Sequence, residues 1–416
     1  MKKEKPLHFH WVVAFLVFLE MIIIGGLINS ASVFIIPVCE SFDISRSTFA
    51  SANIPYNLLS MVGTLCTGLI FHRFGYQKPA IISLLLVGAS MAVAGASQSV
   101  FSYSIARCLF GIGYGVCFTA GATFIIRNWF HRHQGLVLGA VSMASGLGGS
   151  LMTVLLTSIT DQFNWRIASY TAAALCVLMA VLYLILRDRP EEKGLRPFGF
   201  GLIEKKEKKS RTDATHFPGP TFAQLVKHPG FYLMILCFFL CCSCIYMASA
   251  TAVPHFRSKG FSSGAAAAYQ SALMLVLAAA KLVCGGLCDR FGAKSVSLVC
   301  VGCAALGELI LGLSIDPVLC ALGTALLAIG LCMTSILIPL LAQNLFGYRS
   351  AVAVNGIFLA MACAANILAS ILSGICFDST GSYSPGYVAA AGGNLVVAGI
   401  LLVVFRLTRQ NRQSAE

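Results

Sequence analysis

The chain has 416 residues, of which 57% are hydrophobic and only 11% are charged, against about 25% charged residues in a typical soluble protein. Sixteen acidic residues are too few to solubilise the surface of so apolar a globule, so the composition excludes an ordinary soluble protein and indicates a lipid bilayer as the solvent. The net charge of +13 would suit a nucleic-acid-binding protein, but the basic residues are concentrated in the terminal segments and in the loops between the apolar runs, a distribution that reflects membrane topology and excludes that class.

Apolar segments long enough to cross a bilayer as helices, about 20 residues each, recur along the whole chain. A backbone in hydrocarbon must satisfy its own hydrogen bonds, and the runs lack the alternation of a β-barrel, so we expect an all-α membrane protein. The first run has no small-residue cleavage site, which predicts a retained span. The twelve predicted spans are 11–37, 48–71, 79–98, 101–126, 135–159, 166–186, 230–256, 263–288, 295–314, 317–345, 350–376 and 384–405.

Basic residues are distributed unevenly between the predicted loops. Of the 29 Lys and Arg, 23 lie in the two terminal segments and in the loops that follow every second span. The positive-inside rule assigns these segments to the cytoplasm, which predicts a multi-pass protein of the cell membrane with both termini inside. The longest loop is a charged linker, so the predicted domains are a six-helix bundle over 1–186, the linker 187–229 and a six-helix bundle over 230–416.

The 17 cysteines lie almost entirely within apolar runs, and none has the His/Cys spacing of a metal site. We interpret them as small buried side chains. The chain also lacks a recognisable nucleophile–base pair or nucleotide loop. We therefore predict no catalytic residues, no metal site, no cofactor and no enzymatic activity.

Two short segments, 68–75 and 285–292, are near copies of each other at an offset of 217 residues, which is about half the chain. Each closes a long apolar run and is followed by a lysine, Lys78 or Lys294. A duplicated, mostly apolar half with the same basic turn in both copies is typical of transporters built from two similar bundles.

The second copy resembles the Gly-x-x-x-Asp-Arg-x-Gly-x-Lys motif of the major facilitator superfamily, whereas in the first copy His72 replaces the aspartate and the lysine is shifted by one position. The resemblance implies twelve helices in two six-helix bundles. Glycine permits the tight turn in both copies, and the motif implies a conformational latch. We expect the His72 copy to be a weaker or pH-dependent latch. The residues assigned to the latch are Gly68, Arg73, Gly75, Gly285, Asp289, Arg290, Gly292 and Lys294.

Further segments resemble the branch of monocarboxylate transporters and oxalate–formate antiporters. These segments are Trp11-Val12-Val13 at the first span, the loop 34–47, Asn128-Trp129-Phe130 after the fourth span and 189–197 after the sixth. In that branch an arginine in the eighth span binds the substrate carboxylate, and the corresponding residue here is Lys281. The resemblance therefore implies a carboxylate substrate held by a different cation.

Four charged residues lie inside predicted spans, where insertion costs about 2.5–3.5 kcal/mol each: Glu20, Arg107, Lys281 and Glu308. Lys281 precedes Asp289 by eight residues, about 12 Å along a helix, which puts it near the bilayer middle. We predict that Lys281 binds the substrate and takes part in proton coupling, because a buried lysine can lose its proton; the alternative is a snorkelling or structural lysine. Arg107 is either a second substrate cation or a structural and coupling group.

The two buried glutamates have different predicted roles. Glu20 in the first span is a candidate for the coupling proton, because burial favours a protonated carboxyl; a structural hydrogen bond or a position facing lipid is an equal alternative. Glu308 in the ninth span is expected to be structural. Asn29, Tyr246 and Thr119 are predicted to complete a substrate cavity, and each is also a candidate for a simple bond between helices.

The predicted function is secondary active transport of a small organic anion, in the first instance a monocarboxylate, by alternating access. Protons or an exchanged anion would supply the driving force, and the lipid bilayer is the surrounding partner. The alternatives are a carrier of neutral or zwitterionic solutes, a drug efflux pump and, from another class, a membrane sensor without transport.

Overall fold

The computed structural model describes residues 8–130, 134–195, 197–198, 222–227, 229–334, 341 and 351–413. Within these ranges the regular secondary structure is entirely helical, apart from one isolated bridge between Phe130 and Phe198, so the predicted all-α fold is confirmed. The long helices are α1 (His8–Asn29), α4 (Ile54–Phe74), α5 (Gln77–Ala96), α6 (Val100–Trp129), α7 (Gln134–Gln162), α8 (Trp165–Leu182), α11 (Pro229–Ala250), α13 (Ser263–Phe291), α14 (Ala293–Leu313), α15 (Pro317–Cys332), α17 (Ala351–Thr380) and α18 (Ser384–Gln413). The short ones are η1 (Ala31–Phe34), α2 (Ile35–Phe42), α3 (Arg46–Ala52), η2 (Pro190–Lys193), α10 (Phe222–Leu225) and α12 (Ala252–Ser258).

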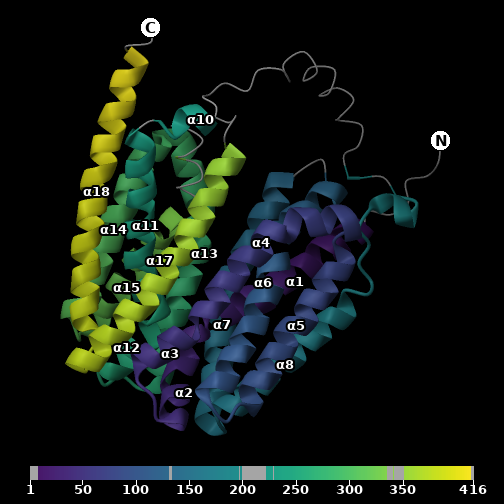
Figure 1. Cartoon of the computed structure of the whole chain (residues 1–416), viewed down its shortest axis with the longest axis horizontal. Helices are drawn as coiled ribbons and strands as arrows, with labels where there is room; N and C mark the ends of the chain where they lie inside the picture. The colour runs from purple at the N-terminus through teal and green to yellow at the C-terminus, as the bar shows by residue number, and fades with distance from the viewer. Residues whose placement is uncertain are drawn as a thin grey trace. The chain divides into compact units, whose positions relative to one another are not determined.

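The chain forms two compact units. The first contains Met1–Ser30 and Ala52–His216, and the second contains Ala31–Ser51 and Phe217–Glu416. Each unit is a bundle of long helices, α1 and α4 to α8 in the first and α11 to α18 in the second (Figure 1). The segment 31–51 thus groups with the second unit, although in sequence it lies inside the first half.

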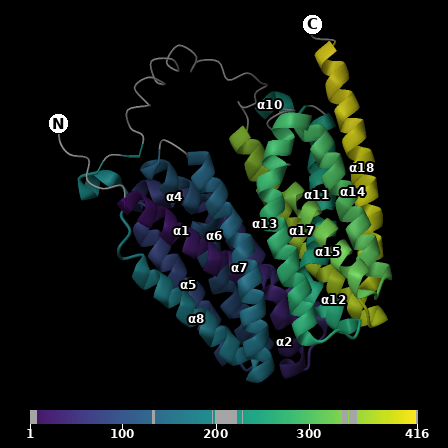
Figure 2. The same ribbon diagram turned by 180° about the vertical axis from the view of Figure 1, so that it is seen from behind.

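The two units repeat the same pattern of helix contacts. In the first unit α1 packs on α7, α4 on α6, and α5 on both α6 and α8. In the second unit α11 packs on α17, α13 on α15, and α14 on both α15 and α18, which are the corresponding helices. The same neighbours are visible from behind in Figure 2. The duplication suggested by two short turns therefore extends to the packing of whole bundles.

Glycines allow the closest helix approaches inside the bundles. A methyl group at Gly148 would overlap the carbonyl oxygen of Ile22 on α1, and one at Gly115 would overlap that of Ser60 on α4. In the second unit a Cβ at Gly330 would lie 2.5 Å from the Cβ of Ala304. Helices in lipid gain association energy from such close packing of small residues rather than from the hydrophobic effect.

Three of the predicted spans are interrupted. The first ends as α1 at Asn29 and continues through η1 into α2, the second breaks at Asn53 between α3 and α4, and the seventh breaks at Thr251 between α11 and α12. Pro37, Pro55 and Pro254 each stand in the first turn of the helix after the break. Proline fits there because those backbone positions have no intrahelical acceptor, whereas inside a helix it removes a hydrogen bond.

Cations from neighbouring segments contact the carboxyl ends of two corresponding helices. Nη1 of Arg166 donates to the carbonyls of Gly95 and Ser97 at the end of α5. Nζ of Lys259 donates to the carbonyls of Leu311 and Ser314 at the end of α14. A positive group at this end of a helix interacts favourably with its dipole and satisfies carbonyls that lack helical partners.

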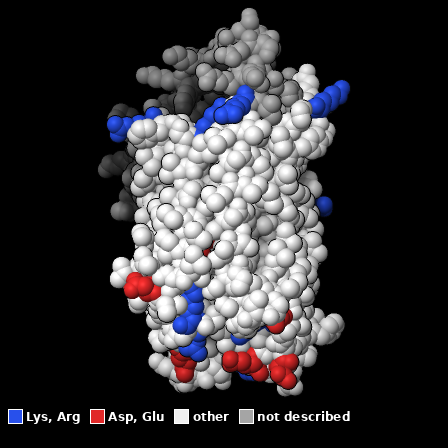
Figure 3. Space-filling view, turned by 90° about the vertical axis from the view of Figure 1, so that its left-hand side faces the viewer, with Lys and Arg blue, Asp and Glu red and all other residues white. Residues whose placement is uncertain are grey.

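The apolar helices have the dimensions of membrane spans. In the described ranges nine helices are long and apolar enough to cross a bilayer, and three shorter apolar stretches occur at Ala31–Phe42, Val100–Val116 and Pro317–Cys332. On the face of the second unit in Figure 3, a broad and nearly uncharged band separates Lys and Arg at one end from a mixed group rich in Asp and Glu at the other. The protein is therefore a multi-pass membrane protein.

Candidate functional site

Arg107 is held in a fixed orientation on α6 of the first unit, where it is 9% exposed. Its Nε–H donates to Oδ1 of Asn53 over 2.6 Å. The guanidinium carbon lies 4.7 Å from the ring centroid of Tyr56 and 4.9 Å from that of Phe110, so two aromatic rings stabilise its charge. No carboxylate pairs with this cation in the part of the chain that the structure describes.

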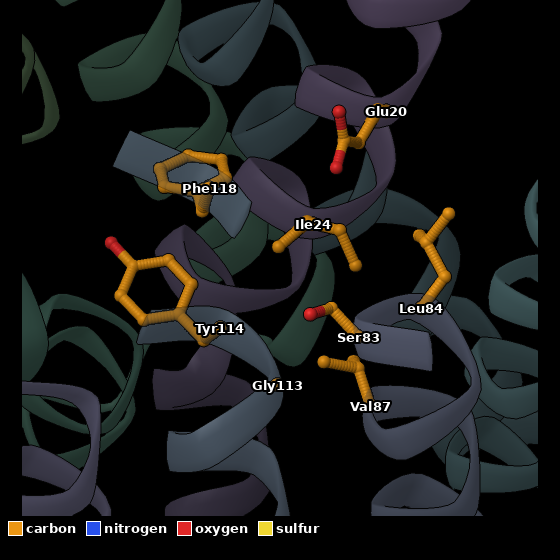
Figure 4. A pocket seen from close by; sticks show the side chains of 8 residues that line it. All are labelled: Glu20, Ile24, Ser83, Leu84, Val87, Gly113, Tyr114 and Phe118. Carbon is orange, nitrogen blue, oxygen red and sulfur yellow. The ribbon is translucent and has the colours of Figure 1, made fainter. Parts of the chain in front are cut away.

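Aromatic rings continue from Arg107 along α6. The Tyr56 ring lies 6.1 Å from that of Tyr114, which in turn lies 4.8 Å from Phe118. Tyr114 and Phe118 line a small cavity that also meets Glu20 of α1 and Ser83 of α5 (Figure 4). The cavity is small, with room for about one water molecule.

Glu20 joins three helices of the first unit. Its side chain is 1% exposed, and Oε2 accepts from the hydroxyl of Tyr183 at 2.5 Å and from that of Tyr76 at 2.8 Å. Tyr76 stands directly before α5 and Tyr183 directly after α8. One carboxyl oxygen therefore receives two donors, while the cavity beside it opens toward the aromatic rings of α6.

Lys281 lies on the face of α13 whose neighbouring residues Ala278 and Cys284 are buried. The sulfur of Cys332, at the end of α15, lies within electrostatic range of its ammonium. Across the described ranges this ammonium has neither a hydrogen bond nor an ion pair. The second unit thus holds a half-buried cation whose charge no described carboxylate neutralises.

The remaining predicted cavity residues differ in their surroundings. Nδ2 of Asn29 donates to the carbonyl of Ser145 over 3.0 Å and so connects α1 to α7. Tyr246 on α11 lies close to Thr334, which follows the same end of α15 that approaches Lys281. The side chain of Thr119 on α6 lies outside the described residues.

Glu308 is fully buried in the second unit, where it accepts a hydrogen bond of 2.9 Å from Nδ2 of Asn394. This bond connects α14 to α18. The structural role of Glu308 stays a prediction, and this residue provides a second buried glutamate against which Glu20 can be compared.

The first copy of the repeated turn is fastened by an aspartate from elsewhere in the chain. Gly75 ends α4 with φ of +74°, and Arg73 and His72 before it are exposed. Oδ1 of Asp188 accepts from the backbone N–H of Tyr76 at 2.8 Å and of Gln77 at 2.7 Å, at the amino end of α5. A methyl group at Gly75 would overlap the same carboxylate. Both the positive φ and the closeness of Asp188 therefore require glycine at this position.

The second copy has a glycine with a similar positive φ and a more open environment. Gly292 ends α13 with φ of +80°, and no atom would approach a Cβ there within 4 Å. Arg290 lies over the ring of Phe291 at 5.4 Å, as Arg73 lies over Phe74 at 5.5 Å in the first copy. Lys294 lies 5.3 Å from the ring of Phe405. Gly68 lies within α4, and Gly285 and Asp289 lie within α13. The surroundings of Gly285 and of the Asp289 side chain are not among the described parts of the chain.

Asp188, Tyr76, Tyr183 and Asn53 are the interacting residues that the sequence analysis missed. Asp188 carried one visible signal, because it is an isolated acid in the basic segment Arg187-Asp188-Arg189 that follows the last apolar run of the first half. The two tyrosines flank apolar helices without a motif of their own, so only the fold connects them to Glu20.

Residues 11–335 match the family model of the Major Facilitator Superfamily. The chain belongs to this superfamily. Monocarboxylate transporter 12 of Homo sapiens is 22% identical over 431 residues, a match that covers 97% of this chain and 82% of the human protein.

Other superfamily members match shorter segments or the fold alone. The "Probable 4-methylmuconolactone transporter" of Cupriavidus pinatubonensis is 24% identical over 142 residues, covering 33% of this chain and 32% of that protein. The chain spans less than half the length of the first curated relatives that it matches. The crystal structure of the nucleoside transporter NupG has a TM-score of 0.73 at 14% identity, covering 96% of this chain and 99% of that one, which shows the shared fold.

The first turn yields a stability prediction. Asp188→Ala leaves two backbone N–H groups at the start of α5 without their acceptor, and we expect a loss of about 1–2 kcal/mol, in the range of a lost helix cap. Asp188→Asn retains the accepting oxygen and should lose less. Thermal unfolding in detergent measures both, with the exposed His72→Ala as the control. A larger loss for His72→Ala than for Asp188→Ala would contradict this role of Asp188.

Proposed function

We propose that this protein is a secondary active transporter of small organic anions, with monocarboxylates as the first candidates, that works by alternating access in the cell membrane. The observation that carries the proposal is one basic side chain within each bundle, the buried Arg107 and the half-buried Lys281, without a carboxylate partner in the described ranges. An unpaired charge inside a membrane protein is costly. An anionic substrate would neutralise it during each transport cycle.

The surroundings of the two cations suggest different tasks. Arg107 has its Nε–H and both aromatic contacts already occupied, so the terminal nitrogens are pre-oriented for the two parallel hydrogen bonds that a carboxylate accepts. Lys281 offers a compact charge among small and sulfur-containing side chains, which favours attraction of an anion and exchange of a proton over a rigid grip. We assign substrate binding to both residues and proton coupling to Lys281.

Glu20 is the second group to which we assign proton coupling. The support is a fully buried carboxyl that receives two tyrosine hydroxyls and adjoins a cavity with room for one water. A water at this place would provide a route for a proton to the carboxyl.

The names of the relatives agree with an organic acid as substrate, since they include monocarboxylate transporters and a cis,cis-muconate transport protein. A carrier of neutral solutes is the competing function. The fold is shared with nucleoside and xylose transporters, so the fold does not distinguish between the two functions. Counterflow in proteoliposomes with labelled lactate, formate, oxalate and muconate distinguishes the two.

We also propose that both termini and the linker 187–229 face the cytoplasm, on the basis of the distribution of Lys and Arg.

Removal of the Lys281 charge should weaken recognition of the anion. We expect Lys281→Gln to lower counterflow of the preferred carboxylate at least about tenfold, equivalent to about 1.4 kcal/mol of lost binding. Lys281→Arg should retain binding of the anion and lose part of its proton dependence. The exposed Lys227→Gln is the control. Parental transport by both Lys281 variants would refute a substrate role for this lysine.

Asn53 offers a test of Arg107 that separates transport from structure. In Asn53→Asp a carboxylate would stand at the atom that now accepts from Nε, and the resulting ion pair would satisfy the cation inside the protein. We expect thermal stability to be retained while anion counterflow falls about tenfold. Asn53→Ala should fall less, because the cation stays unpaired. Unchanged counterflow in Asn53→Asp would show that Arg107 has a structural role only.

Proton coupling through Glu20 can be measured against the other buried glutamate. Glu20→Gln keeps an oxygen that accepts from both tyrosines but cannot release a proton. Accumulation driven by a pH gradient should therefore be lost while counterflow without a gradient continues. Glu308→Gln should accumulate substrate normally. Equal pH-driven accumulation in the two variants would count against Glu20.

A further inference from the structure

Two buried oxygen atoms in the second unit lack a hydrogen-bond donor among the described residues, and they belong to side chains that are bonded to each other. Glu308 on α14 and Asn394 on α18 are both 0% exposed, and Oε2 of Glu308 accepts from Nδ2 of Asn394 at 2.9 Å. The other oxygen of each side chain, Oε1 of Glu308 and Oδ1 of Asn394, has no partner in the described part of the chain. Buried acceptors without a donor are costly, so both atoms call for an explanation.

Close helix contacts on both sides of this pair argue against a bridging water as the missing donor. Each member of the pair directly follows a glycine. A Cβ at Gly307 on α14 would lie 2.7 Å from the carbonyl oxygen of Gly323 on α15, and a Cβ at Gly393 on α18 would lie 2.6 Å from Sγ of Cys244 on α11. A buried water needs its own space and two to four polar partners. The tight approach of these helices therefore favours a donor that lies within the pair itself.

The surroundings supply no positive charge that would stabilise an ionised carboxyl. The described groups within electrostatic range of Glu308 are the thiols of Cys241 and Cys244 on α11 and the phenol of Tyr387 on α18. In the described ranges α13 and α15 place no charged group in this range, and Lys281 of α13 lies beyond it. A carboxylate here would be removed from water without compensation, which favours the protonated form.

We propose that Glu308 is a proton-binding site, in which the carboxyl holds a proton on Oε1 and donates it to Oδ1 of Asn394. A protonated carboxyl is a donor as well as an acceptor, so one proton satisfies both of the oxygens that lack a partner. Together with the bond from Nδ2 to Oε2 it closes a ring of two hydrogen bonds between an acid and an amide. The pair thereby connects α14 to α18 as a neutral unit.

The proton also determines the charge inside the second bundle. Lys281 and Glu308 are the only Asp, Glu, Lys or Arg residues within the predicted spans of the second half. With Glu308 neutral, no negative charge in these spans offsets the ammonium of Lys281. This consequence rests on the proposed anion transport, in which an interior of positive potential attracts the substrate. The proton site itself does not depend on the substrate, and the two experiments below detect it without one.

Infrared spectroscopy detects the proton directly. At neutral pH, in a detergent without ester groups, the protein should show a carbonyl band of a protonated carboxylic acid that is lost in Glu308→Gln. The control Glu20→Gln should retain this band. In Asn394→Leu the acid stays but its hydrogen bonds are removed, so the band should move to higher frequency. A spectrum of Glu308→Gln identical to that of the parent would overturn the proposal, and a band that does not move in Asn394→Leu would overturn the ring.

The pH dependence of stability provides a second test. Above about pH 4.3, the ordinary pKa of a glutamic acid side chain, the unfolded chain releases the proton that folded Glu308 keeps, so stability falls as pH rises. Glu308→Gln can form both hydrogen bonds of the ring but has no proton to release. The melting temperature of the parent should therefore fall relative to that of Glu308→Gln by about 3 °C for each pH unit, until the folded protein also releases the proton.

The two melting curves are compared from mildly acidic to alkaline pH in the same detergent. Parallel curves for the parent and Glu308→Gln would show that folding does not bind a proton at this residue, and they would overturn the proposal. Absence of carboxylate counterflow in a parent protein that shows the expected spectrum and the expected pH dependence would refute the substrate class and leave the proton site in place.

Discussion

Every backbone N–H and C=O in the bilayer must find its partner inside the protein, and this constraint organises the structure. Long helices meet it along their length but leave unsatisfied groups at their ends. In this protein side chains from distant segments supply the missing partners. Asp188 accepts from the start of α5, while Arg166 and Lys259 donate to the ends of α5 and α14. These contacts set where each helix begins and ends, and so they set the depth of the residues between.

The acidic and the basic side chains inside the bundles differ in how their polar groups are satisfied. The carboxyls of Glu20 and Glu308 receive hydrogen bonds from neighbouring helices, so each contributes to the packing that surrounds it. The cations Arg107 and Lys281 have no carboxylate partner in the described ranges. Arg107 is partly compensated by aromatic rings, whereas Lys281 has only a polarisable sulfur nearby. This imbalance leaves net positive charge in the interior of both units, which is the electrostatic condition for attracting an anion.

The number and approximate positions of the helices could be predicted from the sequence because hydrophobic run length is a local property. The helix breaks at Asn53 and Thr251 could also have been found, since Pro55 and Pro254 mark them, but a run that stays apolar across a proline looks continuous. Contacts over long sequence separations could not be predicted. The sequence analysis looked to His72 for the first latch, whereas the structure brings Asp188 to that turn from 112 residues away. The bond between Asn29 and Ser145 was equally invisible.

The grouping of residues 31–51 with the second unit bears on how this protein could have arisen and how it can be divided. A gene duplication makes two equal halves, and the linker after α8 looks like the natural point at which to separate them. The second half expressed alone would nevertheless lack the segment that covers Gly374 and Asp378, and the backbone of α17 would be exposed there. A fragment of the second half would therefore need residues 31–51 as well to keep this part of α17 covered.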